Sequence, residues 1–368
     1  MKKRLPLVLC FITILLLPFY AAPSYLYAQS TEETAEQRGS RIEDKKENLL
    51  EKPETPAEIL RMIRERAEVK IEEKRKQLLW KTKTAAGLKF GFETNPLNDR
   101  AEKGDWFVEE ELTFNWVPTF TEHLGADVGY RVTNQSYMEQ TDLNTFDNDF
   151  TASLKYYPFE SHELFLQPGA TYEWLAYPRD ELATYEDTKA FLKFKHYIGT
   201  DWYYGGKYEY SHKAYDNKLA RDINKNSLSE IQRKDHRNTV ELYVTRNISK
   251  YSLRLKAKAY RNNSNDEYQA YYDSYSYRGY LTLSGSFLKD DRLYVSFTPD
   301  YEIKSYDRRI TVDTARWDNV LNYKLDAYYT VTKNLEIAYT YSYKNSISNA
   351  ESGEFLDLTN SLGMTYRF

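Results

Sequence analysis

The feature that most constrains this sequence is an alternation of apolar and polar residues that begins near Lys83 and continues to the end of the chain. In its first segment, Leu88, Phe90 and Phe92 share one parity, and the polar Lys89 lies between them. Because successive side chains of a β-strand point to opposite faces, such a segment forms a strand with one apolar face and one polar face.

Further segments repeat this alternation to the last residue. They cover residues 106–116, 124–132, 146–156, 164–174, 190–198, 202–210, 240–248, 253–259, 275–287, 293–303, 321–329, 335–343 and 356–368. The pattern therefore predicts an all-β fold with about fourteen antiparallel strands, within a range of about 12 to 16.

The lengths of the connections favour a membrane barrel over a soluble sandwich. Short turns are expected near residues 117–123, 158–163, 198–201, 248–251, 288–291 and 331–334. Longer loops lie between them, and the longest is expected at about Lys213–Arg237. Short turns at one end and long loops at the other are typical of transmembrane barrels. An even strand count places both chain ends at the short-turn end, which is the periplasmic end in such barrels.

We therefore expect a transmembrane, antiparallel, up-and-down β-barrel. It must be closed, because an open sheet edge would leave backbone groups unpaired in hydrocarbon. The mean hydropathy of −0.75 excludes a bundle of transmembrane helices. The 35 tyrosines and the tryptophans near strand ends, such as Trp116 and Trp202, suit the aromatic girdles of a barrel. The net charge of −4 gives no indication of nucleic-acid binding.

The N-terminal region has a different organisation from the barrel. Residues 1–28 have the basic start, apolar run and small-residue end of a signal peptide. Residues 29–54 are polar and without period, which predicts a flexible linker. Residues 55–81 begin with a capping box, Thr55 to Glu58, and predict a charged periplasmic α-helix that serves as an arm or a plug. The barrel then spans 82–368.

The end of the chain resembles the C-terminal signature of Gram-negative outer-membrane barrels. Leu362, Met364, Tyr366 and the terminal Phe368 alternate with smaller or polar residues. The resemblance implies that the last strand is recognised by the barrel-assembly machinery, and that the protein lies in outer-membrane lipid and lipopolysaccharide. In size and rhythm the whole of 82–368 is similar to a porin-like protein of about fourteen strands.

Two charged residues break the parity of their strands. Glu110 lies among lipid-facing positions, so either a bulge within 109–111 turns it inward or a protomer contact shelters it. Arg246 lies two residues from a short turn, where its side chain can snorkel to the membrane surface.

The inward positions carry charges of both signs, and these are the candidate channel-lining residues. The acids are Glu109, Glu111, Asp127, Glu173, Glu209, Asp300, Glu302 and Asp326, and the bases are Arg131, Lys155, Lys193, Lys195, Lys207, Arg254, Lys256, Lys258, Arg278 and Lys324. Charged walls of opposite sign would create a transverse field across a pore. Alternatively, the charges pair and stiffen the wall.

Aromatic residues also occupy inward positions, where they could stack on passing sugars or simply support the wall. They are Tyr157, Phe165, Phe191, Tyr203, Tyr243, Tyr280, Tyr294 and Tyr328.

The function indicated by this pattern is transport without catalysis. The five histidines have no spacing typical of a catalytic triad or a metal site, and the only cysteine, Cys10, lies in the signal peptide, so we expect no enzyme, no metal and no cofactor. The first hypothesis is a channel for passive transport of small polar solutes or oligosaccharides. The alternatives are a barrel that exports or assembles an envelope polymer, with residues 55–81 docking a periplasmic partner, and a surface protein that acts through its loops.

Overall fold

The computed structural model describes residues 82–368, except 98–102, 160–162, 223, 225, 268–272, 308–315 and 351–352. The predicted signal peptide, linker and helix lie outside these residues. All the strands described here belong to one compact unit, Leu78–Phe368. No helix among the described residues is long and apolar enough to cross a membrane.

Fourteen strands form the fold. They are Thr82–Glu93 (β1), Asp105–Trp116 (β2), Leu124–Tyr137 (β3), Thr145–Tyr156 (β4), Leu164–Ala176 (β5), Tyr185–Ile198 (β6), Trp202–Arg221 (β7), Ser227–Ile248 (β8), Tyr251–Ser264 (β9), Ser274–Phe287 (β10), Leu293–Tyr306 (β11), Trp317–Thr330 (β12), Leu335–Ser348 (β13) and Phe355–Arg367 (β14). The prediction of an all-β fold with about fourteen strands is confirmed.

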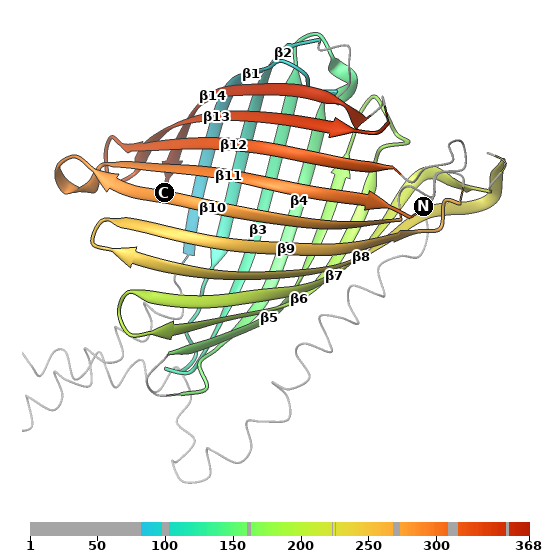
Figure 1. Cartoon of the computed structure of the whole chain (residues 1–368). Coiled ribbons are helices and arrows are strands. Elements are labelled where there is room, and N and C mark those ends of the chain that lie inside the picture. The colour runs from blue at the N-terminus through green and yellow to red at the C-terminus, as the bar shows by residue number, and fades with distance from the viewer. Residues whose placement is uncertain are drawn as a thin grey trace, which may run out of the picture. The chain divides into compact units, whose positions relative to one another are not determined.

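The strands make one closed antiparallel barrel in which each strand pairs with its neighbours in the sequence (Figure 1). Closure is made by β1 and β14, whose register runs from Ala85 opposite Arg367 to Glu93 opposite Thr359. The backbone N–H of Phe368 also donates to the carbonyl of Thr84 at 2.9 Å, so both ends of the barrel segment meet at one seam. The barrel thus leaves no open sheet edge.

The connections differ between the two ends of the barrel, as the sequence predicts. All six predicted short turns lie at the end where β1 begins and β14 finishes. The tightest of them are the β8–β9 turn and the β6–β7 turn, where Gly199 adopts a φ of 64°, a conformation that glycine tolerates.

One predicted loop is wrong. Residues 213–237 are not a loop, because β7 and β8 continue through them as a hairpin that extends at the long-loop end of the barrel (Figure 1). The pairing of Tyr210 with Asn238 continues to Ala214 opposite Lys234, and register shifts follow near Leu219. The connection itself is only residues 222–226.

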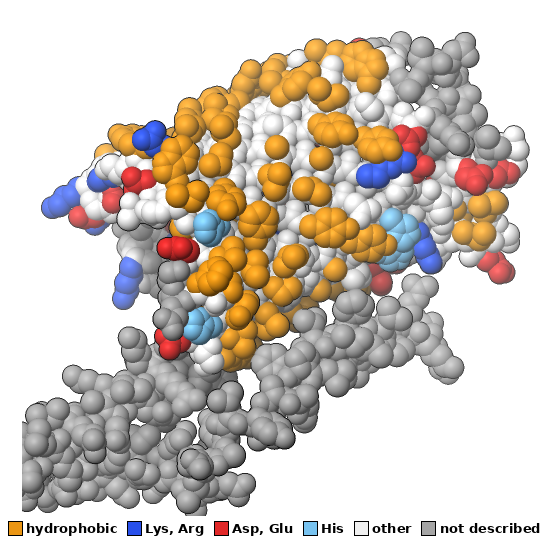
Figure 2. All heavy atoms as spheres, turned by 60° about the horizontal axis from the view of Figure 1, so that its bottom comes forward, with side chains coloured by type: hydrophobic (Ala, Val, Ile, Leu, Met, Phe, Trp, Pro, Cys, Tyr) orange, Lys and Arg blue, Asp and Glu red, His pale blue; other side chains and the backbone are white. Residues whose placement is uncertain are grey.

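In this barrel most large apolar side chains lie on the outer surface and not in a buried core. Large apolar side chains such as Leu112, Leu242 and Leu362 are at least half exposed on the outer face, and few hydrophobic residues are buried. Figure 2 shows apolar side chains spread over the outer surface of the barrel. Exposed apolar area on this scale is unfavourable in water, so the outer face is built for contact with lipid.

The bulge considered at Glu110 is wrong. The pairing of β2 is continuous on both sides, with Glu110 opposite Leu88 in β1 and opposite Asn134 in β3. Glu110 is therefore exposed on the outer face, where its Oε2 accepts a hydrogen bond of 3.3 Å from Nδ2 of Asn134. Arg246 is also outward, and its guanidinium lies 5.1 Å from the ring centroid of Trp202, near the short-turn end.

Candidate functional site

The inner wall of the barrel is the candidate site. Strand alternation and the register of the pairs place all eighteen predicted channel-lining residues on the inner face. Their part in conduction stays a prediction, because the structure alone does not measure it.

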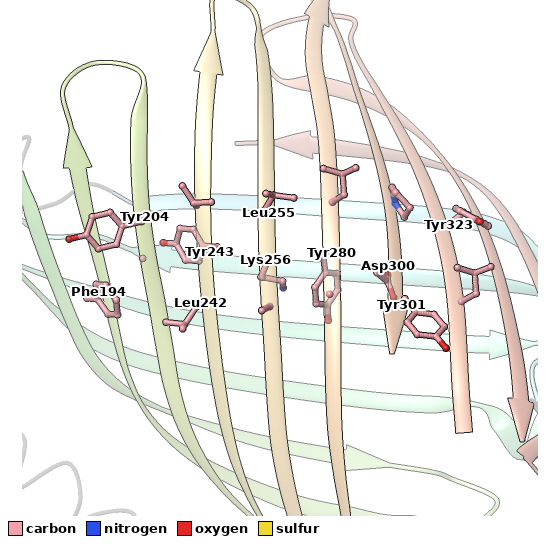
Figure 3. A pocket seen from close by; sticks show the side chains of 17 residues that line it. Phe194, Tyr204, Leu242, Tyr243, Leu255, Lys256, Tyr280, Asp300, Tyr301 and Tyr323 are labelled. Atoms are coloured by element: carbon pink, nitrogen blue, oxygen red, sulfur yellow. The ribbon is translucent and has the colours of Figure 1, made fainter. Parts of the chain in front are cut away.

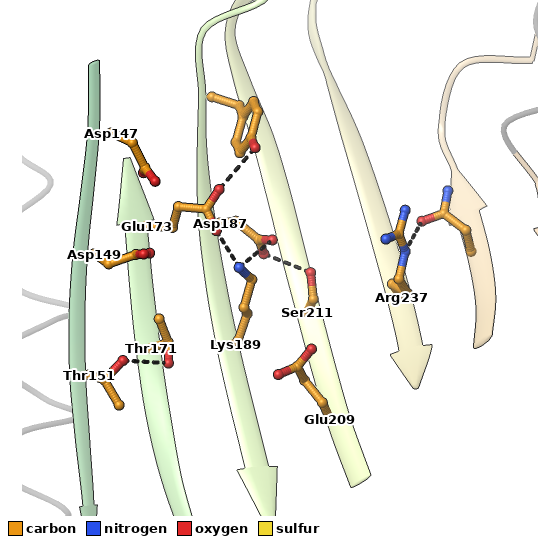
Figure 4. Close-up of polar contacts among 12 residues, drawn as sticks. Asp147, Asp149, Thr151, Thr171, Glu173, Asp187, Lys189, Glu209, Ser211 and Arg237 are labelled. Carbon is orange, nitrogen blue, oxygen red and sulfur yellow. Dashed lines mark hydrogen bonds and ion pairs between the residues drawn. The ribbon is translucent and has the colours of Figure 1, made fainter. Parts of the chain in front are cut away.

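Many of these charges make ion pairs along the wall, so the pairing alternative describes part of it. Lys89 lies 2.6 Å from Glu109, and Lys155 lies 2.9 Å from Asp127. Nε of Arg278 donates to Asp300 at 2.7 Å. Figure 4 shows Lys189 placed between Glu173 and Asp187, with Ser211 donating to Asp187 at 2.7 Å. Such pairs fix the direction of long side chains, although each adds little to stability while water reaches it.

The charges are nevertheless segregated around the barrel. We call the inner face of β6–β10 the basic wall and the inner face of β1–β5 the acidic wall. Inward bases of the basic wall are Lys189, Lys193, Lys195, Lys207, Lys213, Arg233, Arg237, Arg254, Lys256, Lys258 and Arg278, and its inward acids are Asp187, Glu209, Asp235 and Glu241. Inward acids of the acidic wall are Glu93, Asp105, Glu109, Glu111, Asp127, Asp147, Asp149 and Glu173, and its inward bases are Lys83, Lys89, Arg131 and Lys155. Walls of opposite sign are expected to set up a transverse field in the lumen, which stays a prediction.

A row of directly paired inward residues crosses the basic wall at one level. Tyr243 pairs with Lys256, Lys256 with Tyr280, and Tyr280 with Asp300. Figure 3 shows these four side chains along one row of strands. Nζ of Lys256 lies 4.1 Å from the ring centroid of Tyr280, which is close enough for a cation–π interaction.

Several inward rings lie against the wall because the residue opposite is glycine. Phe107 pairs with Gly91, Phe191 pairs with Gly169, and Tyr243 pairs with Gly205. A Cβ at Gly91 or Gly169 would lie 2.5 Å from Cζ of the facing phenylalanine, so only glycine leaves room for these rings. Phe107 and Phe191 are buried there, which favours the supporting role for Phe191 over stacking on cargo.

Several inward charged residues were missing from the predicted channel lining, among them Asp187, Lys213, Asp235, Arg237 and Asp318. Asp187 was left out although it shares the parity of Lys189, and Lys213, Asp235 and Arg237 were assigned to the predicted loop. Asp318 is the second residue of β12, after Trp317. Lys213 shares the parity of Glu209, and Asp235 and Arg237 share the parity of Glu241. This shared parity is the signal that could have identified the three residues as inward.

At the long-loop end of the basic wall, four of these residues, Asp187, Lys213, Asp235 and Arg237, help to enclose a polar recess of about 260 Å³. Lys213, Arg233, Arg237 and Lys304 contribute its positive charges. A larger hollow, of about 790 Å³, is lined mainly by outward apolar residues such as Phe194, Tyr204 and Leu255 (Figure 3). Its lining suits lipid rather than a polar solute.

The histidines do not assemble a catalytic or metal site in the part of the chain that the structure describes. His212 and His236 pair across β7 and β8 on the outer face, with their Nδ1 atoms 3.2 Å apart. Within the described ranges no group of three or more His, Cys, Asp or Glu residues could hold a metal ion.

A closed fourteen-stranded barrel with an apolar outer face and a charged inner face defines the class: the fold is that of a porin-like transmembrane β-barrel, like the barrels of Gram-negative outer membranes.

The chain is similar in fold to solved outer-membrane barrels. OmpT, an outer membrane protein of Vibrio cholerae, has 9% sequence identity and a TM-score of 0.46, and the match covers 78% of this chain and 97% of that one. OprB of Pseudomonas putida has 9% identity and a TM-score of 0.44, with 81% and 96% covered. An outer membrane channel of Pseudomonas putida has 13% identity and a TM-score of 0.42, with 78% and 95% covered. No known protein family and no curated protein sequence matches the chain.

Proposed function

We propose that the protein is a channel for passive transport of small polar solutes or oligosaccharides across the outer membrane of a Gram-negative bacterium. The observation that carries this proposal is the charged inner wall of a barrel of fourteen strands. A barrel of about eight strands can be filled by its own side chains, whereas larger barrels enclose space for water or for a plug. The rings that lie against glycines in β1, β5 and β7 leave more of the lumen for water, which supports the proposal.

The proposed orientation has the short turns and the two ends of the barrel segment in the periplasm. In outer-membrane barrels the short turns are periplasmic and the long loops are extracellular. The last strand suits recognition by the barrel-assembly machinery, because Leu362, Met364, Tyr366 and Phe368 share the outward face and Phe368 is 73% exposed. Outer-membrane lipid and lipopolysaccharide are the proposed surroundings of the apolar face.

Single-channel recording in planar bilayers tests the proposal. The refolded mature chain is compared with a variant that lacks residues 29–81, because the predicted helix could close the lumen. A large and steady conductance in both proteins is the expected result for an open channel. Conductance that appears only after the deletion would identify residues 29–81 as a plug or gate.

The absence of conductance in both proteins would refute the channel. The control for correct folding is the shift in gel mobility on heating that folded outer-membrane barrels show, measured on the same preparations. A protein that is folded by this measure but does not conduct counts against the proposed function.

A further inference from the structure

The polar recess at the long-loop end of the basic wall is built from five neighbouring strands and from the end of β6. Its register row runs from Ser211 in β7 to Arg237 in β8, then to Asn262 in β9 and Ser274 in β10. Ser274 pairs in turn with Tyr306 in β11. The recess encloses about 260 Å³ and opens inside the barrel, since all these positions are inward.

The two carboxylates of the recess already have partners. Asp235 accepts hydrogen bonds from Nε and Nη2 of Arg233 at 3.1 and 2.7 Å, and Arg233 is only 2% exposed. Asp187 accepts from Ser211 at 2.7 Å and lies 3.6 Å from Nζ of Lys189, which itself faces Glu173. The negative charges in the recess are therefore occupied by cations or hydroxyls of the wall.

Three cations of the recess are matched less closely: Asp187 and Asp235 lie opposite Lys213 in the strand pairs, but the described residues show no ion pair between them. Among the described residues, no carboxylate lies within 4.0 Å of Nζ of Lys213, Nζ of Lys304 or the guanidinium of Arg237. Their contacts are with neutral groups: Lys213 lies 3.5 Å from the ring centroid of Tyr185, Lys304 lies 4.8 Å from that of Tyr306, and Arg237 donates to the Asn262 side chain at 3.2 Å.

These three cations repel one another in the half-enclosed recess, and this repulsion does not stabilise the fold. The same arrangement raises the local concentration of anions and strengthens their hydrogen bonds. The hydroxyl of Ser274, the amide of Asn262 and the phenol of Tyr215 surround the cations with groups that can bond to sugar hydroxyls.

We propose that this recess binds an acidic saccharide by its carboxylate or phosphate group, at the long-loop entrance of the channel. This proposal rests on the proposed function for its biological purpose, although the binding itself does not require conduction. Its volume is below the roughly 300 Å³ at which pockets for drug-sized ligands begin, so the recess accommodates about one sugar unit. From there Lys193 and Lys195 of the basic wall, which make no ion pair with the described carboxylates, lie toward the short-turn end.

Titration calorimetry on the full chain in detergent tests the recess directly. The probes are sodium D-glucuronate, D-glucose 6-phosphate, D-glucose and inorganic phosphate. We expect both acidic sugars to bind at least about tenfold more tightly than glucose, because charge-assisted hydrogen bonds are stronger than neutral ones. Phosphate that binds as tightly as glucose 6-phosphate would overturn the assignment to a saccharide.

The informative variant is the double substitution Lys213→Met and Lys304→Met. It should lower the affinity for glucuronate about tenfold or more without lowering the unfolding temperature, because among the described residues neither lysine makes an ion pair with a carboxylate. The matched control, Lys250→Met with Lys333→Met, removes the same charge from the short-turn end and should bind glucuronate as the unchanged protein does. Arg237→Gln is a second variant that should weaken binding in the same direction.

Equal affinity for glucuronate in the unchanged protein and in the Lys213 and Lys304 variant would overturn the proposal. Conductance recorded on the same preparations separates this outcome from failure of the channel. Binding without conductance refutes the channel and leaves the recess, whereas conductance without preferential binding of acidic sugars refutes the recess alone.

Discussion

At the scale of single residues, the lumen is shaped by glycines as much as by charges. Parity alone predicts that Phe191 and Tyr243 face inward, but it does not predict the direction of their rings. That direction depends on the residue across the strand pair, Gly169 for Phe191 and Gly205 for Tyr243. The register between neighbouring strands is not evident from the sequence, so these glycine–aromatic pairs could not be recognised from it. An aromatic ring over a glycine is a known device for filling a gap in a sheet.

Gly169→Ala should therefore destabilise the barrel. The new Cβ would lie 2.5 Å from Cζ of Phe191 and 2.6 Å from Cβ of Ser153, and the ring, which is now buried, would have to move into the lumen. Overpacking of this kind costs about 1–3 kcal/mol. The measurement is the free energy of unfolding in urea for the protein refolded into lipid vesicles.

Gly279→Ala is the matched control for that substitution. Gly279 faces outward in β10, and a Cβ there would meet no heavy atom within 4 Å. Its free energy of unfolding should stay the same or rise slightly, because alanine loses less backbone entropy than glycine. Equal losses in the two variants would show that ring placement does not explain the role of Gly169.

At the scale of elements, the β7–β8 hairpin is where the sequence misled the prediction. Alternation identifies a strand only where one face meets lipid and the other meets the lumen. Beyond the apolar belt both faces meet polar surroundings, and outward positions such as Asp216 and Lys234 are charged. A strand in that setting has the composition of a loop, although its backbone pairing continues.

The hairpin is tied to the neighbouring β9–β10 loop through Asp266. This carboxylate accepts hydrogen bonds from Nε and Nη2 of Arg221 at 3.2 and 2.9 Å, and its side chain is fully buried. Asp266→Ala removes these bonds and should loosen the tip by about 1–3 kcal/mol. We expect trypsin to cut after Lys218 or Arg221 about tenfold faster, while the rest of the barrel stays intact, as followed by gel electrophoresis and mass spectrometry.

The exposed ion pair at the opposite end of the barrel provides the comparison. Lys250 lies 2.7 Å from Asp291, and both side chains are about half exposed, at 55% and 53%. Asp291→Ala should leave the digestion pattern and the stability nearly unchanged, because water and salt screen such pairs. Faster cleavage at the hairpin in this variant as well would contradict a specific role for Asp266.

At the scale of the whole molecule, closure and strand count were predictable because lipid imposes one pattern on every strand. The inner face of the candidate site was predictable for the same reason, since it is the opposite parity. Parity does not predict which charged residues form ion pairs, because this depends on the register between strands. The pair of Arg278 and Asp300 is an example. Parity placed Glu110 on the outer face correctly, but the bulge offered as its alternative is wrong, because the sequence did not show that Asn134 lies opposite it.

The segregation of charge predicts opposite effects on ion selectivity from the two walls. Lys193 and Lys195 belong to the basic wall and face rings rather than carboxylates among the described residues, with Lys195 lying 3.8 Å from the ring centroid of Tyr203. Lys193→Met with Lys195→Met should shift the channel toward cations. On the acidic wall, Glu111→Gln with Asp147→Asn should shift it toward anions.

The measurement is the zero-current potential across a bilayer with unequal concentrations of potassium chloride on its two sides. The lower concentration is kept near 0.1 M, where the screening length is about 10 Å and wall charges still act on ions in the lumen. Two charges are removed in each variant, so a difference in sign between the two shifts reports the wall from which they were taken. Shifts of the same sign, or no shift in either variant, would mean that the wall charges neutralise one another locally and that no transverse field acts on passing ions.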